Sequence, residues 1–411
     1  MNIWLINHYA VPPRYYPLAR QTYFAKYLMA MGHQVTIFAA STVHNSDKNL
    51  ITDGSKWREE TEDGVHYVYI KCRDYVGSGL KRVYNICEFA WKLPGVCKNF
   101  PKPDAIVATS MPPTSCAMGI HLARKYGCRG IAEIADLWPE SIVAYGIAGP
   151  KNPAVIALRW LEKWIYKKAD SIVFTMEGAY DYILEQGWEK DIPRSKVFHI
   201  NNGVNLEEFE VQCVENRLED TDLLRDDVFK VVYAGSIRRA NGLSELVACA
   251  ELLQQHKDIL FLVYGAGDDL ESLRQRVAAK GLSNILFKGP VPKKNVPFVL
   301  AQSSVNLLNY NTQTAHVYKY GSSQNKLFEY MASGKPILSN IAIAYSVVER
   351  YQCGISRDIT TAQEYADAIL ELYRMNQDEY VRMCENSKQG ARDYDFRKLT
   401  QKLIQVIEGS K

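Results

Sequence analysis

Long hydrophobic runs are missing from this sequence of 411 residues. No stretch contains 18 consecutive apolar residues, so no transmembrane helix is predicted. No basic residue precedes the apolar start of the chain, which turns polar at Asn7. We therefore expect a buried first strand there, no signal peptide, and a cytoplasmic protein.

Closely spaced cysteine pairs are also absent. The chain has nine cysteines, an odd number, and no two of them stand as Cys-x-x-Cys. Disulfide frameworks normally use an even number, and structural zinc sites normally use such pairs. The pattern predicts reduced, mostly buried thiols and no metal site.

The sequence also lacks a large excess of either positive or negative residues. The chain has 49 Lys and Arg against 46 Asp and Glu, a formal net charge of +3, which gives no reason to expect a nucleic-acid partner. The dinucleotide fingerprint Gly-x-Gly-x-x-Gly does not occur, and the first strand leads to Pro12 and Pro13. A nicotinamide-dependent dehydrogenase is therefore disfavoured.

The sequence does contain a regular alternation of apolar strands and amphipathic helices, which is typical of a parallel sheet covered on both faces. In the first half, strands are predicted at Ile3–Ile6, Gln34–Ala39, Val65–Ile70, Asp104–Ala108, Gly130–Ile134, Ser171–Thr175 and Val197–Ile200. Helices are predicted at Arg20–Met31, Leu80–Cys97, Pro113–Tyr126, Ala154–Lys168 and Glu177–Gln186.

A second alternation follows in the other half. Its strands are predicted at Phe229–Ala234, Leu260–Tyr264, Ile285–Lys288, Val305–Asn309 and Pro336–Ser339. Its helices are predicted at Leu243–His256, Asp269–Lys280, Lys294–Ala301 and Ala362–Met375, with a tail helix at Arg397–Glu408. The predicted fold class is α/β, with two Rossmann-like doubly wound domains facing a central cleft.

An acidic, poorly periodic stretch separates the two alternations. We expect a first domain at 1–205 and a second at 206–390, with 206–227 acting as a linker. The last segment, 391–411, is expected to hold a helix that packs back on the first domain.

The segment from Ser322 to Leu338 carries the most chemical information. Small polar residues lead into a helix that begins at Asn325 and is stopped by Gly334. The start of such a helix offers backbone N–H groups and the positive end of its dipole to an anion. Glu329, one turn on, can accept hydrogen bonds from sugar hydroxyls. This combination suits a nucleotide-sugar; the alternative is a capped helix with Glu329 facing water.

Two glycine-containing turns stand after strands in the same half. Gly235 follows the strand that ends at Ala234, and Gly265 and Gly267 follow the strand that ends at Tyr264. Glycine at such turns lets a backbone approach a ligand closely, although ordinary strand-to-helix turns also use it. We expect these turns and the helix start to meet at one edge of the sheet.

With these motifs in place, the chain resembles the retaining GT-B glycosyltransferases of family 4. The segment Glu329-Tyr-Met-Ala-Ser-Gly-Lys-Pro-Ile resembles the donor-site signature of that family, and Asn202-Gly-Val-Asn resembles the end of its first domain. Asp136-Leu-Trp-Pro-Glu-Ser resembles a segment typical of its capsule, colanic-acid and O-antigen branch. The resemblance extends over nearly the whole chain.

The resemblance implies a donor site in the second domain. Glu329 matches the glutamate that holds the nucleotide ribose, and the turn at Gly235 would lie along the diphosphate. The remaining donor candidates on the matching turns are Ser236, Arg238, Arg239, Asn241, Gly265, Gly267, Ser323, Gln324, Asn325 and Lys326.

The donor site departs from the family pattern in two places. Gly321 stands where the family has its first glutamate, which normally contacts the sugar. Ser236 and Asn241 stand where many members have the Arg and Lys that neutralise the diphosphate. Arg238, Arg239 and Lys326 are the nearby cations that can replace them.

On the acceptor side, the resemblance makes Asp136 and Glu140 the candidate catalytic residues, which position the acceptor or take its proton. Arg14, Tyr15 and Arg20, from the altered first turn, are the candidate acceptor contacts. His8 stays open as a base. His199 is interpreted as structural.

The resemblance implies transfer of a sugar, with a UDP-linked donor as the default, to a polyprenyl-diphosphate-linked glycan in bacterial surface polysaccharide biosynthesis. No cofactor and no metal ion are expected, because helix-start amides and cations can stabilise the leaving diphosphate. The alternatives are a nucleotide-sugar epimerase of the same architecture and a non-catalytic relative that binds a glycan or a partner enzyme.

Two segments mix cations with aromatic residues and are candidates for peripheral contact with the inner face of the cell membrane. In 80–98, Phe89, Trp91 and Leu93 would enter the interface beside four cations; 159–168 adds Trp160 and Trp164. The alternative is a pair of helices that pack on the core and expose a solvated side.

Overall fold

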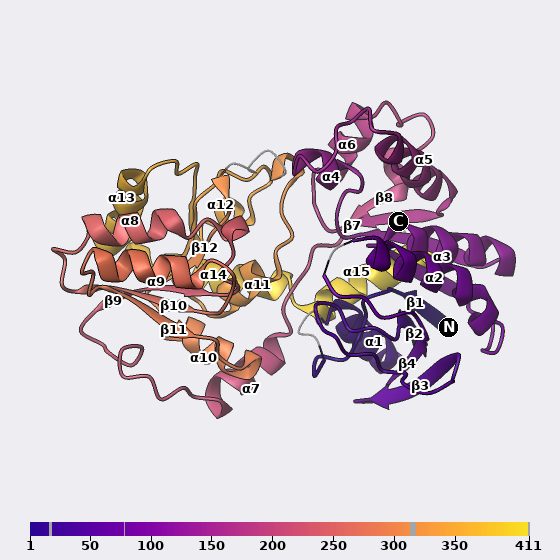
Figure 1. Ribbon diagram of the computed structural model, residues 1–411, viewed down its shortest axis with the longest axis horizontal. Coiled ribbons are helices and arrows are strands. Elements are labelled where there is room, and N and C mark those ends of the chain that lie inside the picture. The colour runs from indigo at the N-terminus through magenta and orange to yellow at the C-terminus, as the bar shows by residue number, and fades with distance from the viewer. Residues whose placement is uncertain (16–18, 78, 313–317, 410–411) are drawn as a thin grey trace. The chain divides into compact units, whose positions relative to one another are not determined.

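The computed structural model describes residues 1–15, 19–77, 79–312 and 318–409. The chain divides into two compact units, Met1–Asn202 with Phe396–Lys411, and Gly203–Asp395. Each unit is built around one sheet with helices on its faces (Figure 1). The predicted α/β class with two Rossmann-like sheets is therefore confirmed.

The sheet of the first unit has eight strands in the order β3-β4-β2-β1-β5-β6-β7-β8. All neighbouring pairs are parallel except β3 with β4. The strands are β1 (Asn2–Ile6), β2 (Gln34–Ala40), β3 (Trp57–Glu62), β4 (Val65–Ile70), β5 (Ala105–Ser110), β6 (Arg129–Ile134), β7 (Ser171–Phe174) and β8 (Val197–His199).

Strand β3 was not predicted from the sequence. It pairs antiparallel with β4 from Trp57 opposite Ile70 to Glu62 opposite Val65. The two residues of the connecting turn, Asp63 and Gly64, have φ angles of 50° and 78°. An Asp-Gly pair with both φ angles positive is a common two-residue hairpin turn, so this pair was the signal that could have revealed the strand.

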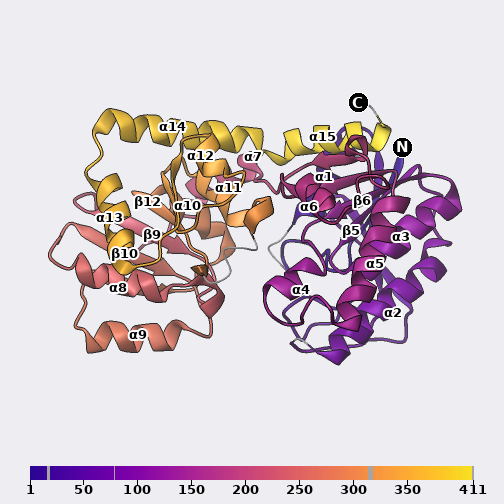
Figure 2. The ribbon, with the colours of Figure 1, turned by 90° about the horizontal axis from the view of Figure 1, so that it is seen from above.

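The helices of the first unit lie on both faces of its sheet. Connections between parallel strands are right-handed. Where successive connections run in the same direction across the sheet, toward β8, their helices therefore lie on the same face of the sheet. The helices α2, α3 and α5 therefore share a face, while α1 and α15 lie side by side on the other (Figure 2). The helices are α1 (Arg20–Ala30), α2 (Leu80–Cys97), α3 (Pro113–Tyr126), α4 (Glu140–Ala144), α5 (Pro153–Lys168), α6 (Ala179–Glu185) and α15 (Phe396–Glu408), with a 3-10 turn at Arg194–Lys196.

The tail helix α15 belongs to the first unit. Its Phe396 ring stacks on Tyr23 at 4.8 Å between centroids and meets Phe24 edge-on at 5.7 Å, both on α1. Aromatic pairs at these distances stabilise the contact beyond simple burial. The chain thus enters the second unit after Asn202 and returns to the first at Phe396.

The sheet of the second unit has six parallel strands in the order β11-β10-β9-β12-β13-β14, which is the arrangement of a dinucleotide-binding fold. Its strands are β9 (Phe229–Ala234), β10 (Ile259–Tyr264), β11 (Ile285–Gly289), β12 (Val305–Leu308), β13 (Ile337–Ser339) and β14 (Gly354–Ser356). Its helices are α7 (Leu206–Glu215), α8 (Ser244–Leu252), α9 (Leu270–Ala279), α10 (Val296–Ala301), α11 (Asn325–Ala332), α12 (Val347–Arg350), α13 (Ala362–Tyr373) and α14 (Gln377–Asp393), with 3-10 turns at Arg239–Asn241 and Lys293–Asn295.

The first part of the predicted linker 206–227 contains a helix that the sequence analysis did not predict. Helix α7 occupies Leu206–Glu215 and packs against α10. The side chain of Asn205 caps the helix by accepting a hydrogen bond of 3.2 Å from the Glu208 N–H. Asparagine at this position followed by acidic residues in the first turn is a good helix start, and the acidic composition masked it.

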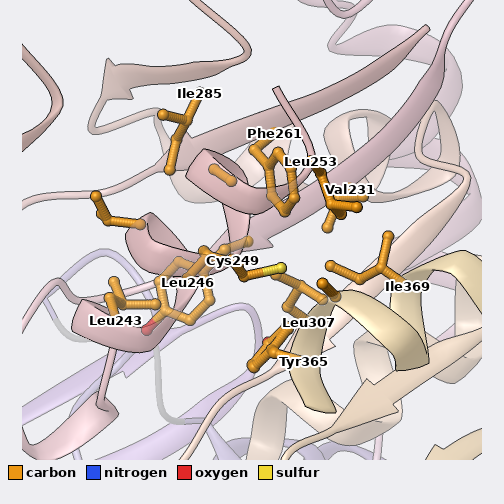
Figure 3. Packing of buried hydrophobic residues seen from close by; sticks show 14 of the residues in the cluster. Val231, Leu243, Leu246, Cys249, Leu253, Phe261, Ile285, Leu307, Tyr365 and Ile369 are labelled. Carbon is orange, nitrogen blue, oxygen red and sulfur yellow. The ribbon is translucent and has the colours of Figure 1, made fainter. Parts of the chain in front are cut away.

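The core of the second unit lies between β9, β10 and β12 and the helices α8 and α13. Figure 3 shows Val231 and Phe261 from the strands facing Leu246 and Cys249 of α8, with Ile369 of α13 closing one side. These residues are almost completely buried. This packing holds the carboxyl ends of the strands, where the candidate site lies, on a rigid base.

Candidate functional site

Two glycine turns and one helix meet at the carboxyl edge of the second sheet. Gly235 follows β9, and Gly265 and Gly267 follow the neighbouring strand β10. The Tyr330 hydroxyl of α11 donates a hydrogen bond of 3.1 Å to the carbonyl oxygen of Ala234, at the end of β9. The three junctions singled out in the sequence therefore lie together within this unit.

The two glycine turns are joined backbone to backbone. The Ile237 N–H donates to the Ala266 carbonyl oxygen over 2.9 Å. A Cβ atom on Gly265 would lie 1.8 Å from the Gly235 oxygen, and one on Gly267 would lie 2.0 Å from the Ile237 oxygen. Both glycines are thus required by the contact between the turns themselves, independently of any ligand.

Lys326 brings a cation to the turn after β9. A Cβ atom on Gly235 would lie 2.2 Å from the Lys326 Nζ, so only glycine leaves room for this amine. The Nζ donates to the Tyr233 hydroxyl over 3.2 Å and lies 4.8 Å from the centre of its ring. Burial of the amine lowers the pKa of Lys326 to about 8, against the opposing attraction of Glu329. The residue as a whole is partly buried.

Ser236 and Asn241, the positions that depart from the family's cations, hold the loop in shape. The Asn241 side-chain amide donates to the Ser236 carbonyl and hydroxyl oxygens over 2.6 and 3.0 Å, and to the Tyr233 hydroxyl over 3.0 Å. The Asn309 side-chain N–H donates to the Asn241 carbonyl oxygen over 3.0 Å. The Asn309 Oδ1 accepts from the Tyr365 hydroxyl over 2.6 Å. Tyr233, Asn309 and Tyr365 were not identified from the sequence, because tyrosine and asparagine beside strands are common.

Arg238 and Arg239 lie on the same loop, and both are exposed. Arg238 immediately precedes the 3-10 turn, and its carbonyl oxygen accepts from the Asn241 N–H over 2.8 Å. The Lys326 amine, in contrast, packs against the turn. Both arginines remain donor-site predictions.

Helix α11 begins where the sequence predicted. Gln324 is extended, with φ −69° and ψ 125°, and Asn325 is the first helical residue. The first N–H groups of a helix point out of its N-terminus; the predicted donor contacts Ser323, Gln324 and Asn325 lie at this helix start and remain predictions. Glu329, one turn on, forms an ion pair with Lys293.

Gly321 has a backbone reason to be glycine. Its φ angle is +99°, a region that residues with a side chain rarely adopt. Glycine therefore suits this position, where the resemblance would place the family's first glutamate.

The predicted catalytic carboxylates of the first unit differ in their surroundings. Asp136 follows β6 and is exposed. The Glu140 carboxylate forms an ion pair of 2.8 Å with Arg159, whose guanidinium also donates to the Tyr182 hydroxyl over 2.8 Å. These contacts favour a structural role for Glu140 and leave Asp136 as the better candidate.

Two of the predicted acceptor contacts lie beside the unexpected strand β3. Arg14 forms ion pairs with Glu60 and Glu62. The Tyr15 ring lies 4.6 Å from the Arg14 guanidinium carbon and 4.3 Å from the Lys48 Nζ. Their assignment to the acceptor stays a prediction.

Arg20, the third acceptor candidate, is buried in a polar cluster at the carboxyl edge of the first sheet. Its guanidinium donates to Glu133 over 2.9 Å and to the Asn201 carbonyl oxygen over 2.6 Å. Glu133 also accepts from Gln21 over 3.0 Å and from Thr109 over 2.7 Å. A buried ion pair with its hydrogen bonds completed in this way acts first on structure, which disfavours a contact between Arg20 and the acceptor.

Neither histidine considered as a base is placed for that role. His8 is fully buried, and its Nε2 lies 2.7 Å from the Asn85 Oδ1. Burial lowers the pKa of His8 to about 3, which keeps the ring neutral. His199 lies 3.9 Å from Glu177 through its Nδ1. We assign both to structure.

The expectation of a metal-free site overlooked two Asp-x-Asp spacings, a possible metal-binding pattern: Asp393-Tyr394-Asp395 and, before β9, Asp220-Thr221-Asp222. Here Lys288 donates to Asp220 over 2.7 Å and to Asp222 over 2.6 Å, and Tyr264 donates to Asp220 over 2.7 Å. The pair of carboxylates is therefore neutralised by a lysine. Among the described residues, no group of three or more His, Cys, Asp or Glu is arranged to hold a metal ion.

The structure also bears on the predicted membrane contact. Within the described part of the chain, every helix is too short or too polar to cross a bilayer. The predicted peripheral contact through 80–98 and 159–168 involves α2 and α5, which lie on one face of the first sheet.

Comparison with protein families finds a match in each half of the chain. The model of the family described as Glycosyltransferase Family 4 matches residues 21–208. That of the family described as Glycosyl transferases group 1 matches residues 216–390. The two matches follow one another and together cover most of the chain.

Among characterised sequences, the chain is similar to the probable glycosyltransferase WbjE of Pseudomonas aeruginosa. The two are 24% identical over 266 residues, which is 64% of this chain and 62% of the relative. The chain therefore spans less than two thirds of the length of that curated relative.

Solved structures share the fold at low sequence identity. HepE of Anabaena, in complex with UDP, has a TM-score of 0.67 and 13% identity, covering 100% of both chains. WaaG, described as a glycosyltransferase involved in lipopolysaccharide biosynthesis, has a TM-score of 0.65 and 13% identity, covering 99% of this chain and 100% of that one. These likenesses show the GT-B fold.

Proposed function

Because models of two glycosyltransferase families match the two halves of the chain, we propose that it transfers a sugar from a nucleotide-sugar to a glycan acceptor with retention of anomeric configuration. The proposed donor is UDP-linked. Support comes from HepE, a protein of the same fold that binds UDP and UDP-glucose. The second unit is the proposed donor site.

The observation that carries the proposal is the position of Lys326. Its amine lies over the Gly235 turn at the first turn of α11. A diphosphate bound there would meet a cation and helix-start N–H groups together. Both would stabilise the negative charge that grows on the leaving UDP as the bond to the sugar breaks. Lys326 thus takes over the neutralising role that the family's Arg and Lys have at the positions of Ser236 and Asn241.

Glu329 is proposed to accept hydrogen bonds from the ribose hydroxyls. It forms an ion pair with Lys293, whose side chain is 50% exposed, while that of Glu329 is 23% exposed. An exposed lysine loses little free energy when it leaves such a pair for water. The nucleotide would therefore displace Lys293 and take its place on the carboxylate.

The proposed acceptor is a polyprenyl-diphosphate-linked glycan at the inner face of the cell membrane, in surface polysaccharide biosynthesis. Support comes from the Asp136-Leu-Trp-Pro-Glu-Ser segment and from the likeness to WaaG. Asp136 is the proposed positioning group for the attacking hydroxyl. It is exposed and follows a strand of the first sheet, where parallel α/β sheets commonly bind ligands.

A panel of UDP, GDP, TDP, CDP and ADP in thermal-shift measurements tests the donor class. A nucleotide at 100 times its dissociation constant adds about 2.7 kcal/mol to the free energy of unfolding. We expect UDP to raise the melting temperature of the wild type most. If no nucleotide raises it, the transferase proposal fails in favour of a non-catalytic relative.

An incubation with the UDP-sugar alone separates transfer from epimerisation. A transferase leaves the sugar stereochemistry of the remaining donor unchanged until an acceptor is added. A new epimer in the absence of acceptor would overturn the proposal.

A further inference from the structure

Large apolar side chains are exposed along one face of α2. Leu80 is 79% exposed, Tyr84 66% and Trp91 78%. The first two are four residues apart and Trp91 follows seven later, so all three lie on one side of the helix. Phe89 and Leu93 are buried in the core, so the expectation that they enter a membrane was wrong.

Helix α5 exposes a second row of the same kind. Ile156, Trp160 and Trp164 are spaced by four residues, and Trp160 is 75% exposed. Between α2 and α5 lies α3, which contacts both (Figure 2). The three helices form one layer over the sheet, so their outward sides face the same way. Exposed tryptophans gathered in this way mark an interaction surface.

The same layer is strongly basic. The segments 80–98, 113–126 and 153–168 contain ten Lys or Arg residues and two glutamates, a formal charge of +8, although the whole chain carries only +3. Of the two glutamates, Glu88 on α2 pairs with Lys92 over 2.8 Å, and Glu162 lies on the buried side of α5. The layer therefore presents an excess of positive charge together with its aromatic residues.

The exposed cations of this layer differ in part from those predicted from the sequence. Arg159 is engaged with Glu140, and Lys163 and Lys167 with Asp191. Lys81 and Lys98 at the ends of α2 are exposed, as are Arg124 and Lys125 at the end of α3. Helix α3, which carries no acidic residue, was not part of the surface predicted from the sequence.

We propose that the outer face of α2, α3 and α5 docks on an anionic lipid bilayer. Tryptophan and tyrosine prefer the boundary between headgroups and acyl chains, and lysine and arginine beside them attract anionic headgroups. The charge excess favours this occupant over a second copy of the chain, whose identical face would repel it. The protruding apolar side chains favour it over a nucleic acid, whose surface is a polar phosphate backbone. The inference deepens the proposed function by naming the face that meets the membrane.

Flotation with lipid vesicles tests the proposal. The probes are vesicles of phosphatidylcholine alone and of phosphatidylcholine mixed with phosphatidylglycerol. We expect the full chain to float only with the mixed vesicles and to be released by high salt. Equal binding to both vesicles, or no binding to either, would overturn the proposal.

Two sets of variants locate the surface. Each Lys or Arg near an anionic surface contributes roughly fivefold to partitioning, so Lys81→Gln with Arg124→Gln and Lys125→Gln should weaken it about 100-fold. Each tryptophan side chain that leaves water contributes about tenfold or more, so Trp91→Gln with Trp160→Gln should weaken it by a similar factor. The matched control is Val214→Gln with Lys280→Gln, exposed residues of the second unit, and should bind as the wild type does.

Three further results decide between occupants. Unchanged binding in both variant sets would place the contact elsewhere and overturn the proposal. Tighter binding to heparin or RNA than to mixed vesicles would make the face a polyanion site. A wild-type dimer that becomes a monomer in the tryptophan variants, without vesicle binding, would make it a self-association surface. UDP thermal shifts measured on the same variants should stay as in the wild type, so failure of this inference is distinguishable from failure of the donor site.

Discussion

The Lys326 amine occupies the space that a side chain at Gly235 would fill, 2.2 Å from the position of its Cβ. The glycine and the lysine come from different junctions, the turn after β9 and the start of α11. This contact explains how Lys326 of α11 can supply a cation to the turn after β9. The turn itself has Ser236 and Asn241 where many family members have cations.

The change Gly235→Ala should weaken UDP binding about tenfold with little loss of stability. The new methyl group meets the flexible end of Lys326, which can move away, and the amine then leaves the turn. Loss of one charge-assisted hydrogen bond corresponds to about 1.5–3 kcal/mol. Calorimetric titration and thermal unfolding check the two effects. An unchanged affinity would show that the diphosphate does not use this amine.

The change Gly267→Ala should instead destabilise the second unit. Its Cβ would lie 2.0 Å from the Ile237 oxygen, a backbone atom that cannot move aside easily. We expect a loss of about 2–4 kcal/mol from overpacking and strain. The matched control is Gly95→Ala, where no atom lies within 4 Å and stability should be unchanged or slightly higher. Equal melting temperatures for the two variants would contradict the packing of the turns.

UDP affinity should fall as pH rises through about 8. The pKa of Lys326 is lowered to about 8, so the amine loses its proton there in the free protein, and only the charged amine attracts the diphosphate. The terminal phosphate of UDP, with a second pKa of about 6, is largely ionised at pH 7, and its charge changes little up to pH 9. Titrations at pH 7 and pH 9 should therefore differ for the wild type and agree for Lys326→Met. The free protein should show the opposite trend in stability, which rises with pH between about 8 and the ordinary lysine value.

Glu329→Gln should lower UDP affinity about tenfold or more and remove discrimination between UDP and 2′-deoxy-UDP. A carboxylate accepts hydrogen bonds from a ribose diol more strongly than a neutral amide does. Lys293→Met, which removes only the competing partner, should leave affinity equal or slightly higher. Binding measured with both nucleotides separates these cases. Full discrimination retained by Glu329→Gln would move the ribose elsewhere.

Arg20→Met should lower stability strongly, by about 3–5 kcal/mol, because it leaves Glu133 buried without its cation. Arg14→Met is the matched control, since its ion pairs with Glu60 and Glu62 are at the surface and contribute under about 1 kcal/mol. Thermal unfolding measures both. A normal melting temperature for Arg20→Met, with only weaker acceptor use, would restore Arg20 to the acceptor.

Much of the fold followed from local patterns. The strands β9 and β10 and the start of α11 at Asn325 were predicted, because buried parallel strands are continuous apolar runs and the helix follows a polar turn. Helix α7 and helix α14 were not, because α7 lies in an acidic stretch and α14 has few apolar residues. Their positions depend on tertiary packing that local composition does not reveal.

Single residues of the candidate site were predicted from the sequence, but the contacts between them were not. Gly235 and Lys326 were both named, but they are 91 positions apart in the sequence, which hides that one packs on the other. The buried partners of the loop, Asn309 and Tyr365, carry no motif. Arg20 was assigned to a ligand because its partner Glu133 is far along the sequence. Long-range pairings of this kind depend on the order of strands in the sheet.

Calorimetric titration of UDP into the wild type, Lys326→Met and Lys280→Met tests the central claim most directly. Lys280 is an exposed lysine of the same unit, paired with Glu251 over 2.6 Å, and serves as the matched control. The account predicts tight binding by the wild type and Lys280→Met and about tenfold or weaker binding by Lys326→Met. Equal affinity in all three proteins, or no binding by the wild type, would contradict a donor site built on Lys326.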